Sequence, residues 1–222
     1  MEARRGDFAM DRPIEIKGLR MIARGAEADI LEAEWMGVRV ILKRRLPKEY
    51  LNPALDARVR YHRTVREAEI LHEAKLSGVP TPLVYFVDPV NAEIIMEMIQ
   101  GFRLKELLES ERRVDLLGVV GQHLGRLHSG GIVHGDPTTS NFILSGKVLY
   151  AIDFGLSFRS RAPQDLASDL HVIKEALESY HSDLSEEAVQ LLMSGYSGAF
   201  DGSSEVIRWL RRLESSGRYR GA

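Results

Sequence analysis

The stretch from Ile132 to Gly155 constrains the fold and the chemistry of this chain more than any other part of the sequence. Three polar side chains stand in it at fixed offsets: Asp136, then Asn141, and then Asp153 at the head of a D-F-G triplet. Short apolar runs between them predict a β-hairpin that turns at residues 145–147. This spacing is typical of the catalytic loop of a phosphotransferase followed by its metal-binding loop.

The residue types suit the transfer of a γ-phosphoryl group, which needs positioning and charge neutralisation more than covalent help from the protein. Magnesium takes oxygen ligands, and we expect Asn141 and Asp153 to supply them from the two ends of the hairpin. Asp136 is then left to face the acceptor oxygen as the catalytic residue. Because a His-Gly-Asp triplet alone also suits an ordinary turn, the prediction depends on the complete set.

Length and composition allow two small lobes. The chain has 222 residues, of which 44% are hydrophobic, enough for one good core or two small ones. A formal net charge of -2 argues against a chain that coats nucleic acid over its whole surface, although it allows a local basic patch. There is no cysteine, which excludes disulfides, thiolate zinc sites and cysteine nucleophiles. Since no apolar run approaches the length of a membrane span, we expect a cytoplasmic protein without membrane contacts.

The N-terminal part predicts an antiparallel sheet with one main helix. Short apolar runs over residues 14–43, 82–87 and 93–98 give five strands, and a helix is expected over 56–76. The small residues of the turn over residues 23–28 would let backbone N–H groups approach a triphosphate closely. An ordinary hairpin would explain the same residues. If the loop binds nucleotide, the contacts come from Gly25, Ala26, Glu27 and Ala28.

Lys43 ends the third strand, where a lysine can reach the α and β phosphates as a compact charge. The alternative is a solvated lysine at the edge of a strand. A partner carboxylate in the following helix would favour the first interpretation. We choose Glu67, which lies beside the core-facing stripe of that helix, over Glu69, whose helical neighbours are polar.

The passage from residue 99 into a helix over 104–110 predicts the hinge between the lobes. Backbone groups of Glu97 and Ile99 could pair there with the edge of an adenine ring, with Met96 at the back of the pocket. The predicted organisation is a lead-in (1–13), an N-lobe (14–99), a C-lobe (100–215) and a basic C-terminal tail (216–222).

The C-lobe is expected to be mostly helical, with an amphipathic helix over 114–129 and further helices over 165–180, 185–200 and 203–215. Only a short segment separates Gly155 from the second of these helices, so the long activation segment of common protein kinases is missing. The predicted fold class is therefore α+β, a reduced two-lobed protein-kinase-like fold. The end of the chain is basic through Arg208, Arg211, Arg212, Arg218 and Arg220.

Motifs along nearly the whole chain after about residue 18 carry a family resemblance. They are H-G-D-P-T-T-S-N with I-D-F-G-L-S, V-I-L-K-R-R around Lys43, R-T-V-R-E-A-E-I-L around Glu67, and the late A-S-D-L-H-V-I-K-E-A-L. Together they resemble the PRPK family (p53-related protein kinase), the small atypical kinase subunit of the KEOPS complex. Pro137 departs from the family, in which leucine is more common, and stiffens the loop without removing a ligand.

The resemblance implies a reduced kinase that acts as an ATPase or a Ser/Thr protein kinase, with ATP and Mg²⁺, or possible Mn²⁺, as cofactors. Its implied partners are the threonylcarbamoyl-transferase subunit of KEOPS, a small accessory KEOPS subunit, and tRNA, on which the complex makes threonylcarbamoyladenosine (t6A). The implied residue roles are a catalytic Asp136, metal ligands Asn141 and Asp153, a phosphate-positioning pair Lys43 and Glu67, and support of the catalytic loop by Asp169.

Three alternatives stay open. A small-molecule phosphotransferase of the aminoglycoside type has a similar loop, but it needs a large helical insertion to enclose its substrate. A RIO-type kinase is the second, although a D-F-G triplet is less expected there. The third is a scaffold that binds ATP while the chemistry occurs elsewhere.

Overall fold

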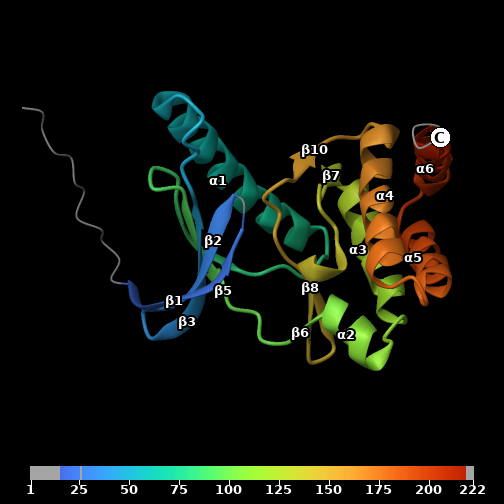
Figure 1. The fold of residues 1–222 in the computed structure, drawn as a ribbon, viewed down its shortest axis with the longest axis horizontal. Helices are drawn as coiled ribbons and strands as arrows, with labels where there is room; N and C mark the ends of the chain where they lie inside the picture. The colour runs from blue at the N-terminus through green and yellow to red at the C-terminus, as the bar shows by residue number, and fades with distance from the viewer. Residues whose placement is uncertain (1–15, 26, 219–222) are drawn as a thin grey trace, which may run out of the picture.

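The computed structural model describes residues 16–25 and 27–218, which form two lobes joined through a single hinge segment (Figure 1). The N-lobe sheet has the strand order β1-β2-β3-β5-β4, and every neighbouring pair is antiparallel. This confirms the predicted five-stranded sheet. Its strands are β1 (Ile16–Arg24), β2 (Ala28–Trp35), β3 (Val38–Arg45), β4 (Val84–Asp88) and β5 (Glu93–Glu97).

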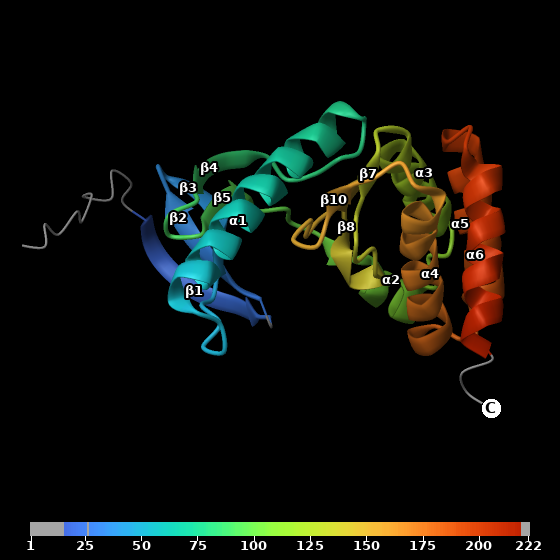
Figure 2. The ribbon, with the colours of Figure 1, turned by 90° about the horizontal axis from the view of Figure 1, so that it is seen from above.

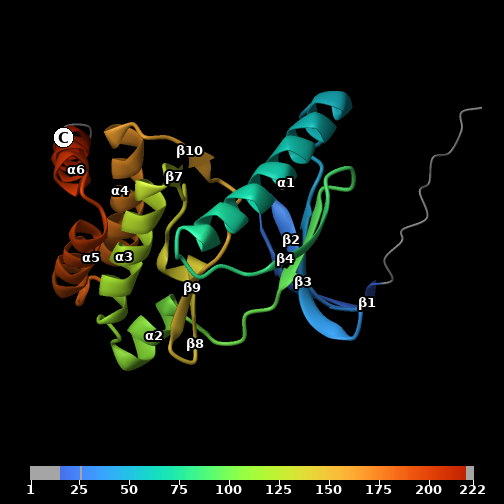
Figure 3. The same ribbon diagram turned by 180° about the vertical axis from the view of Figure 1, so that it is seen from behind.

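Helix α1 (Pro53–Leu76) is the main helix of the N-lobe, and it runs from the sheet to the helical lobe (Figures 2 and 3). It begins three residues before the predicted start at residue 56, because Asn52 caps it and Pro53 suits its first position. The Asn52 side chain accepts hydrogen bonds from the amides of Ala54 and Leu55, at 3.0 and 3.4 Å. The C-terminal half of α1 packs into the core of the other lobe through Ile70, Leu71 and Ala74.

The C-lobe is mostly helical, as predicted. Its helices are α2 (Leu104–Glu111), α3 (Leu116–Ser129), α4 (Pro163–Tyr180), α5 (Ser185–Ala199) and α6 (Ser203–Arg218). The predicted hairpin is present as β8 (Phe142–Ser145) and β9 (Val148–Ala151), preceded by the short 3-10 helix η1 (Thr139–Asn141). The strands β6 (Phe102–Arg103), β7 (Ile132–Val133) and β10 (Phe158–Arg159) were not predicted; β6 extends the hairpin, and β7 pairs with β10.

Helices α3 and α5 lie side by side at a distance that only glycine permits. A Cβ atom on Gly121 would come within 2.0 Å of the Leu192 carbonyl oxygen, and one on Gly195 within 2.0 Å of the Gly118 carbonyl oxygen. These glycines let the backbones of α3 and α5 approach each other closely.

The two lobes differ in how much apolar material they bury. One large core joins the C-lobe helices to the end of α1, whereas the sheet has a separate and much smaller core. The small core consists of Leu31, Ala33, Val40, Leu42 and Ile95. Among the described residues, no helix is both long enough and apolar enough to cross a membrane. The predicted lead-in over 1–13 and the chain end over 219–222, with Arg220, lie outside the described residues.

Candidate active site

A cavity of about 260 Å³ lies between the N-lobe sheet and the β8–β9 hairpin. Its wall on the sheet side is apolar, with Ile22, Ile30 and Ile41 from three neighbouring strands. The charged and polar side chains that line it include Lys43, from β3, and Asp153, which follows the hairpin. An apolar slot with a charged end suits a flat ring that carries phosphate groups.

Lys43 joins the two lobes at the charged end of this cavity. Its ammonium donates to Glu67 Oε1 at 2.6 Å and to Asp153 Oδ1 at 2.7 Å. The predicted choice of Glu67 over Glu69 is therefore confirmed as the contact of Lys43. Burial alone would lower the pKa of Lys43, but the charges of Glu67 and Asp153 outweigh burial and raise this pKa. The lysine is thus a fixed positive charge.

Asp153 is placed by an unusual backbone conformation. Its φ is 60°, in the left-handed region that a residue with a side chain rarely adopts. Glycine at position 155 leaves room for the Lys43–Asp153 contact, because a Cβ atom there would lie 3.1 Å from Asp153 Oδ1 and 3.2 Å from Lys43 Nζ. Burial would raise the pKa of the Asp153 carboxyl, but the ion pair with Lys43 holds this pKa below its ordinary value.

Asp136 and Asn141 are joined directly in the catalytic loop. The Asn141 side-chain nitrogen donates to the Asp136 carbonyl at 2.8 Å and to Asp136 Oδ2 at 3.0 Å. Burial raises the pKa of the Asp136 carboxyl, and the hydrogen bond from Asn141 offsets this only in part. The backbone also ties the two loops together, since the Ile152 amide donates to the Asn141 carbonyl at 2.9 Å.

Asp169 on α4 supports the catalytic loop by binding its backbone amides, as the family resemblance implies. Its carboxylate accepts hydrogen bonds from the amides of His134 and Gly135, at 2.7 and 2.8 Å, and lies 3.1 Å from the ring of His128. Gly135 has a φ of 85°, and a Cβ atom there would lie 2.4 Å from the Leu156 carbonyl oxygen. No larger side chain fits between His134 and Asp136.

His134 is fully buried and packs against Phe154 of the D-F-G triplet, with ring centroids 4.5 Å apart. Desolvation by burial lowers the pKa of its imidazole, although nearby carboxylates act in the opposite direction. The ring therefore supports the loop by packing.

The donor set fits a magnesium ion that is completed by phosphate oxygens. Asn141 and Asp153 both line the cavity, and the hydrogen bonds of Asn141 to Asp136 use its nitrogen rather than its oxygen. In the described part of the chain, no group of three His, Cys, Asp or Glu side chains could hold a metal by itself. Magnesium sites of phosphotransferases commonly have one or two protein ligands and take the rest from the substrate.

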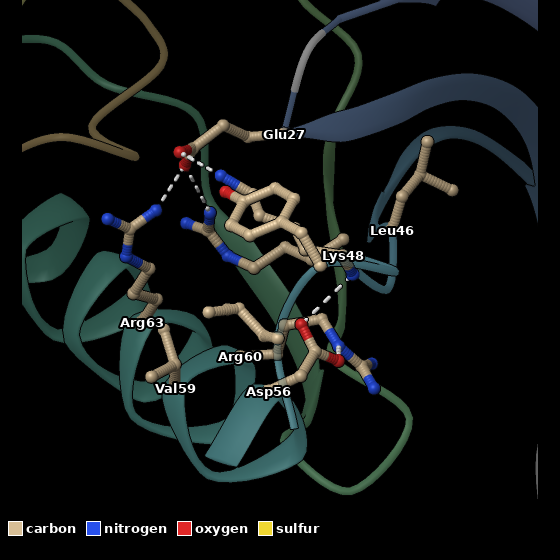
Figure 4. A pocket seen from close by; sticks show the side chains of 10 residues that line it. Glu27, Leu46, Lys48, Asp56, Val59, Arg60 and Arg63 are labelled. Carbon is tan, nitrogen blue, oxygen red and sulfur yellow. Dashed lines mark hydrogen bonds and ion pairs between the residues drawn. The ribbon is translucent and has the colours of Figure 1, made fainter. Parts of the chain in front are cut away.

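The loop between β1 and β2 differs from the sequence-based expectation. The Gly25 amide donates to the Ala28 carbonyl at 2.9 Å, so it is engaged within the loop and not free for a phosphate. The Glu27 side chain turns toward α1 instead of the cavity (Figure 4). Neither these residues nor Ala28 lines the cavity, and Ala26 lies outside the described residues. Nucleotide contacts by this loop stay a prediction.

The hinge residues Glu97, Met98 and Ile99 line the cavity together with Met96, as expected. The Glu97 amide, however, donates to the Leu83 carbonyl at 2.8 Å, so this amide is not free for a ligand. Pairing of the other hinge backbone groups with an adenine ring stays a prediction.

Sequence reasoning missed two arginines of the site. Arg45 is only 4% exposed and donates to Glu67 Oε2 at 2.5 Å. Arg103 lines the cavity and donates to the Ser140 carbonyl at 2.7 Å. For Arg45, its place two residues after Lys43 was the only signal, because its partner is 22 positions away.

Two lobes around such a cavity, with a lysine–glutamate pair, a catalytic loop and a D-F-G triplet, define a protein-kinase-like fold. The solved structure of the Rio2 kinase–ADP/Mg²⁺–phosphoaspartate complex from Chaetomium thermophilum has this fold, with a TM-score of 0.65. The superposition covers 90% of this chain and 72% of the other at 15% sequence identity, so it supports the fold alone.

Sequence comparison gives the family. The RIO domain model matches residues 53–189. The KEOPS complex subunit Bud32 of Pyrococcus abyssi is 42% identical over 91% of this chain and 97% of its own length. A probable bifunctional tRNA threonylcarbamoyladenosine biosynthesis protein of Methanothermobacter thermautotrophicus is 38% identical over 90% of this chain, which spans only 36% of that protein. The chain belongs to the Bud32 (PRPK) family of RIO-domain proteins, which confirms the resemblance and removes the RIO-type kinase as a separate alternative.

Proposed function

We propose that the chain is an ATP-dependent phosphotransferase or ATPase that works in a KEOPS complex and supports t6A modification of tRNA. The observation that carries the enzymatic part is the convergence of Lys43, Asn141 and Asp153 on one cavity, with Asp136 hydrogen-bonded to Asn141. The complex and the tRNA come from the names of the relatives. In the longer relatives, a segment similar to this chain is fused within a protein named for t6A biosynthesis.

Each residue has a role that its contacts support. Lys43, charged and fixed by Glu67, holds the α and β phosphates of ATP. Asn141 and Asp153 hold Mg²⁺, or Mn²⁺ in its place, which neutralises charge on the phosphates when bound. Asp136 orients the attacking hydroxyl or water and accepts its proton. Because burial raises its pKa, the carboxylate is a stronger base than an exposed aspartate.

Water or the protein itself is a better acceptor in this proposal than an extended peptide. The segment after Gly155 is short, and β10 within it pairs with β7 before α4 begins at Pro163. A long activation segment that could align a substrate peptide is absent between Gly155 and α4. Hydrolysis or self-phosphorylation should therefore exceed phosphorylation of arbitrary Ser/Thr peptides.

The proposed partners are the threonylcarbamoyl-transferase subunit, a small accessory subunit and tRNA bound by the complex, in the cytoplasm. The test is a reconstituted complex assayed for ATP turnover and for t6A on tRNA, with the wild-type chain or Asp136→Asn. We expect Asp136→Asn to lose both activities, and the remote exposed change Asp115→Asn to keep both. Full t6A formation with Asp136→Asn would show instead a scaffold that does not use its catalytic aspartate.

A further inference from the structure

The side chain of Glu27, in the β1–β2 loop, lies among three cations from other elements. It accepts hydrogen bonds from Lys48, at 3.1 Å, and from Arg63 of α1 (Figure 4). The guanidinium of Arg45, at the end of β3, lies 3.7 Å away. These residues line a second cavity of about 150 Å³, between the loop and the first turns of α1.

Arg45 connects this cluster with the active site. One of its terminal nitrogens faces Glu27, and the other donates to Glu67 Oε2 at 2.5 Å. The second oxygen of Glu67 accepts from Lys43 at 2.6 Å, and Lys43 in turn contacts Asp153. An unbroken series of charged contacts thus runs from the β1–β2 loop to the metal-binding loop.

The charges in this series alternate, which explains why it is stable when buried. Lys43 and Arg45 are 6% and 4% exposed, and Glu67 between them is 2% exposed. Each buried cation contacts two carboxylates: Lys43 contacts Glu67 and Asp153, and Arg45 contacts Glu67 and Glu27. Burial tends to raise the pKa of Glu27, but the hydrogen bonds from Arg63 and Lys48 hold it below its ordinary value. Glu27 is therefore ionised at neutral pH.

We propose that Glu27 and Arg45 are positioning residues that fasten the β1–β2 loop to helix α1 and to the Lys43–Glu67 pair. Glycine-rich phosphate loops are flexible. This loop has a single glycine, Gly25, and the amide of Gly25 donates a hydrogen bond to the Ala28 carbonyl. A loop held in place before the ligand arrives loses less conformational freedom on binding. Arginine suits position 45 because its planar fork presents one terminal nitrogen to Glu27 and the other to Glu67.

The inference rests on the proposed ATP site and on the predicted contact of the β1–β2 loop with the nucleotide, so its test measures nucleotide affinity as well as turnover. Mg·ADP is titrated into the purified chain, and KM for ATP and kcat are measured for each variant. We expect Glu27→Gln to raise KM and the Mg·ADP dissociation constant about tenfold, with kcat changed by no more than about twofold. Arg45→Met should lower kcat/KM by roughly 100-fold, because it also frees Glu67 to move away from Lys43.

The conservative variant Arg45→Lys separates charge from bridging. It keeps a positive charge beside Glu67, so we expect a normal kcat together with a raised KM. Because both changes break the same link, the double variant with Glu27→Gln should be no weaker in nucleotide binding than Glu27→Gln alone. Matched controls are Glu32→Gln, which loses ion pairs with Arg20 and Arg39 on the sheet, and Arg44→Lys, whose partner is Glu93. Both should bind nucleotide like the wild type.

The outcomes distinguish this inference from the proposed function. If the wild type binds Mg·ADP and Glu27→Gln binds it equally well, the fastening role is overturned while the proposed function stands. If the wild type binds no nucleotide, the proposed function fails and this inference with it. Thermal melting identifies a variant that fails to fold, and Arg45→Lys then carries the test in place of Arg45→Met.

Discussion

Lys43 in the N-lobe is held by side-chain ion pairs, to Glu67 at 2.6 Å and to Asp153 at 2.7 Å. Asp136 in the C-lobe follows a stretch of backbone whose amides are fixed by the fully buried carboxylate of Asp169. The surroundings differ in the same way: the sheet has a small separate core, whereas the catalytic loop lies on the large one. The nucleotide half of the site therefore depends on charge, and the catalytic half depends on the folded C-lobe.

Asp169→Ala should lower both stability and turnover more than any other substitution considered for the two halves. It leaves the amides of His134 and Gly135 buried without their acceptor, and we expect a loss of roughly 3–5 kcal/mol in the free energy of unfolding. Turnover should be lost with it, since the loop that carries Asp136 is released. Urea unfolding measures the change, and Asp165→Ala on the same helix is the control. If the free energy of unfolding falls by less than about 1 kcal/mol, the catalytic half does not depend on the fold as proposed.

Lys43→Met tests the other half. Turnover should fall by about 100-fold because the charge that holds the phosphates is removed. The free energy of unfolding should change by no more than about 1 kcal/mol, because Arg45 still neutralises Glu67 in the variant. The same urea series and a steady-state assay give both values. A large loss of stability would mean that this ion pair also holds the N-lobe together.

The pH dependence of kcat should come from Asp136. Burial raises its pKa above the ordinary value of 3.8, and the base must be ionised to accept a proton. Activity should therefore fall as the pH drops through this raised pKa. Asp153 stays charged there, because Lys43 lowers its pKa.

Ionisation of Asp136 and ionisation of Asp153 change the stability of the fold in opposite directions. The fold favours protonated Asp136, so its ionisation costs stability as the pH rises through its folded pKa. The contribution of the Asp153 ion pair is present above its unfolded pKa and disappears only as the pH falls through its lowered folded pKa.

A profile of kcat against pH with saturating ATP and Mg²⁺ checks the assignment of the acid limb to Asp136. An acid midpoint at or below 3.8 would contradict it.

We expect the smallest change from substitutions on α6, outside both halves of the site. Arg208, Arg211 and Arg212 are exposed there, and Arg212 lies over the ring of Trp209 at 4.9 Å. Changing all three to Gln should weaken tRNA binding by the complex about tenfold or less, and should lower its salt slope by about one for each lost phosphate contact. ATP binding should stay unchanged. Arg112→Gln, on another exposed surface, is the control, and equal tRNA affinity in the triple variant would exclude a role for this surface.

The sequence predicted the catalytic half better than the nucleotide half, for a physical reason. Asn141 and Asp153 flank the β8–β9 hairpin and Asp136 lies shortly before it, so the three residues appear as fixed spacings along the chain. The pairing of Lys43 with Glu67 could be inferred because helical periodicity distinguished Glu67 from Glu69.

Long-range contacts left no such pattern. Arg45 stands in the basic run after Lys43, and the sequence assigned it no role because the carboxylates that pair with it belong to other elements. The engaged amide of Gly25 and the pairing of β7 with β10 are equally invisible in the local sequence. The start of α1 was a different case, since Asn52 followed by Pro53 is a readable capping signal that the prediction did not use.

We propose that both halves of the site act on one magnesium–nucleotide complex. The most direct measurement is phosphate release from ATP by the purified chain, with and without Mg²⁺, for the wild type and Asp153→Asn. We expect the wild type to release phosphate only with Mg²⁺, and a folded Asp153→Asn variant to release it at least about 100-fold more slowly. Equal release by the two proteins, or release by the wild type that does not depend on Mg²⁺, would contradict it.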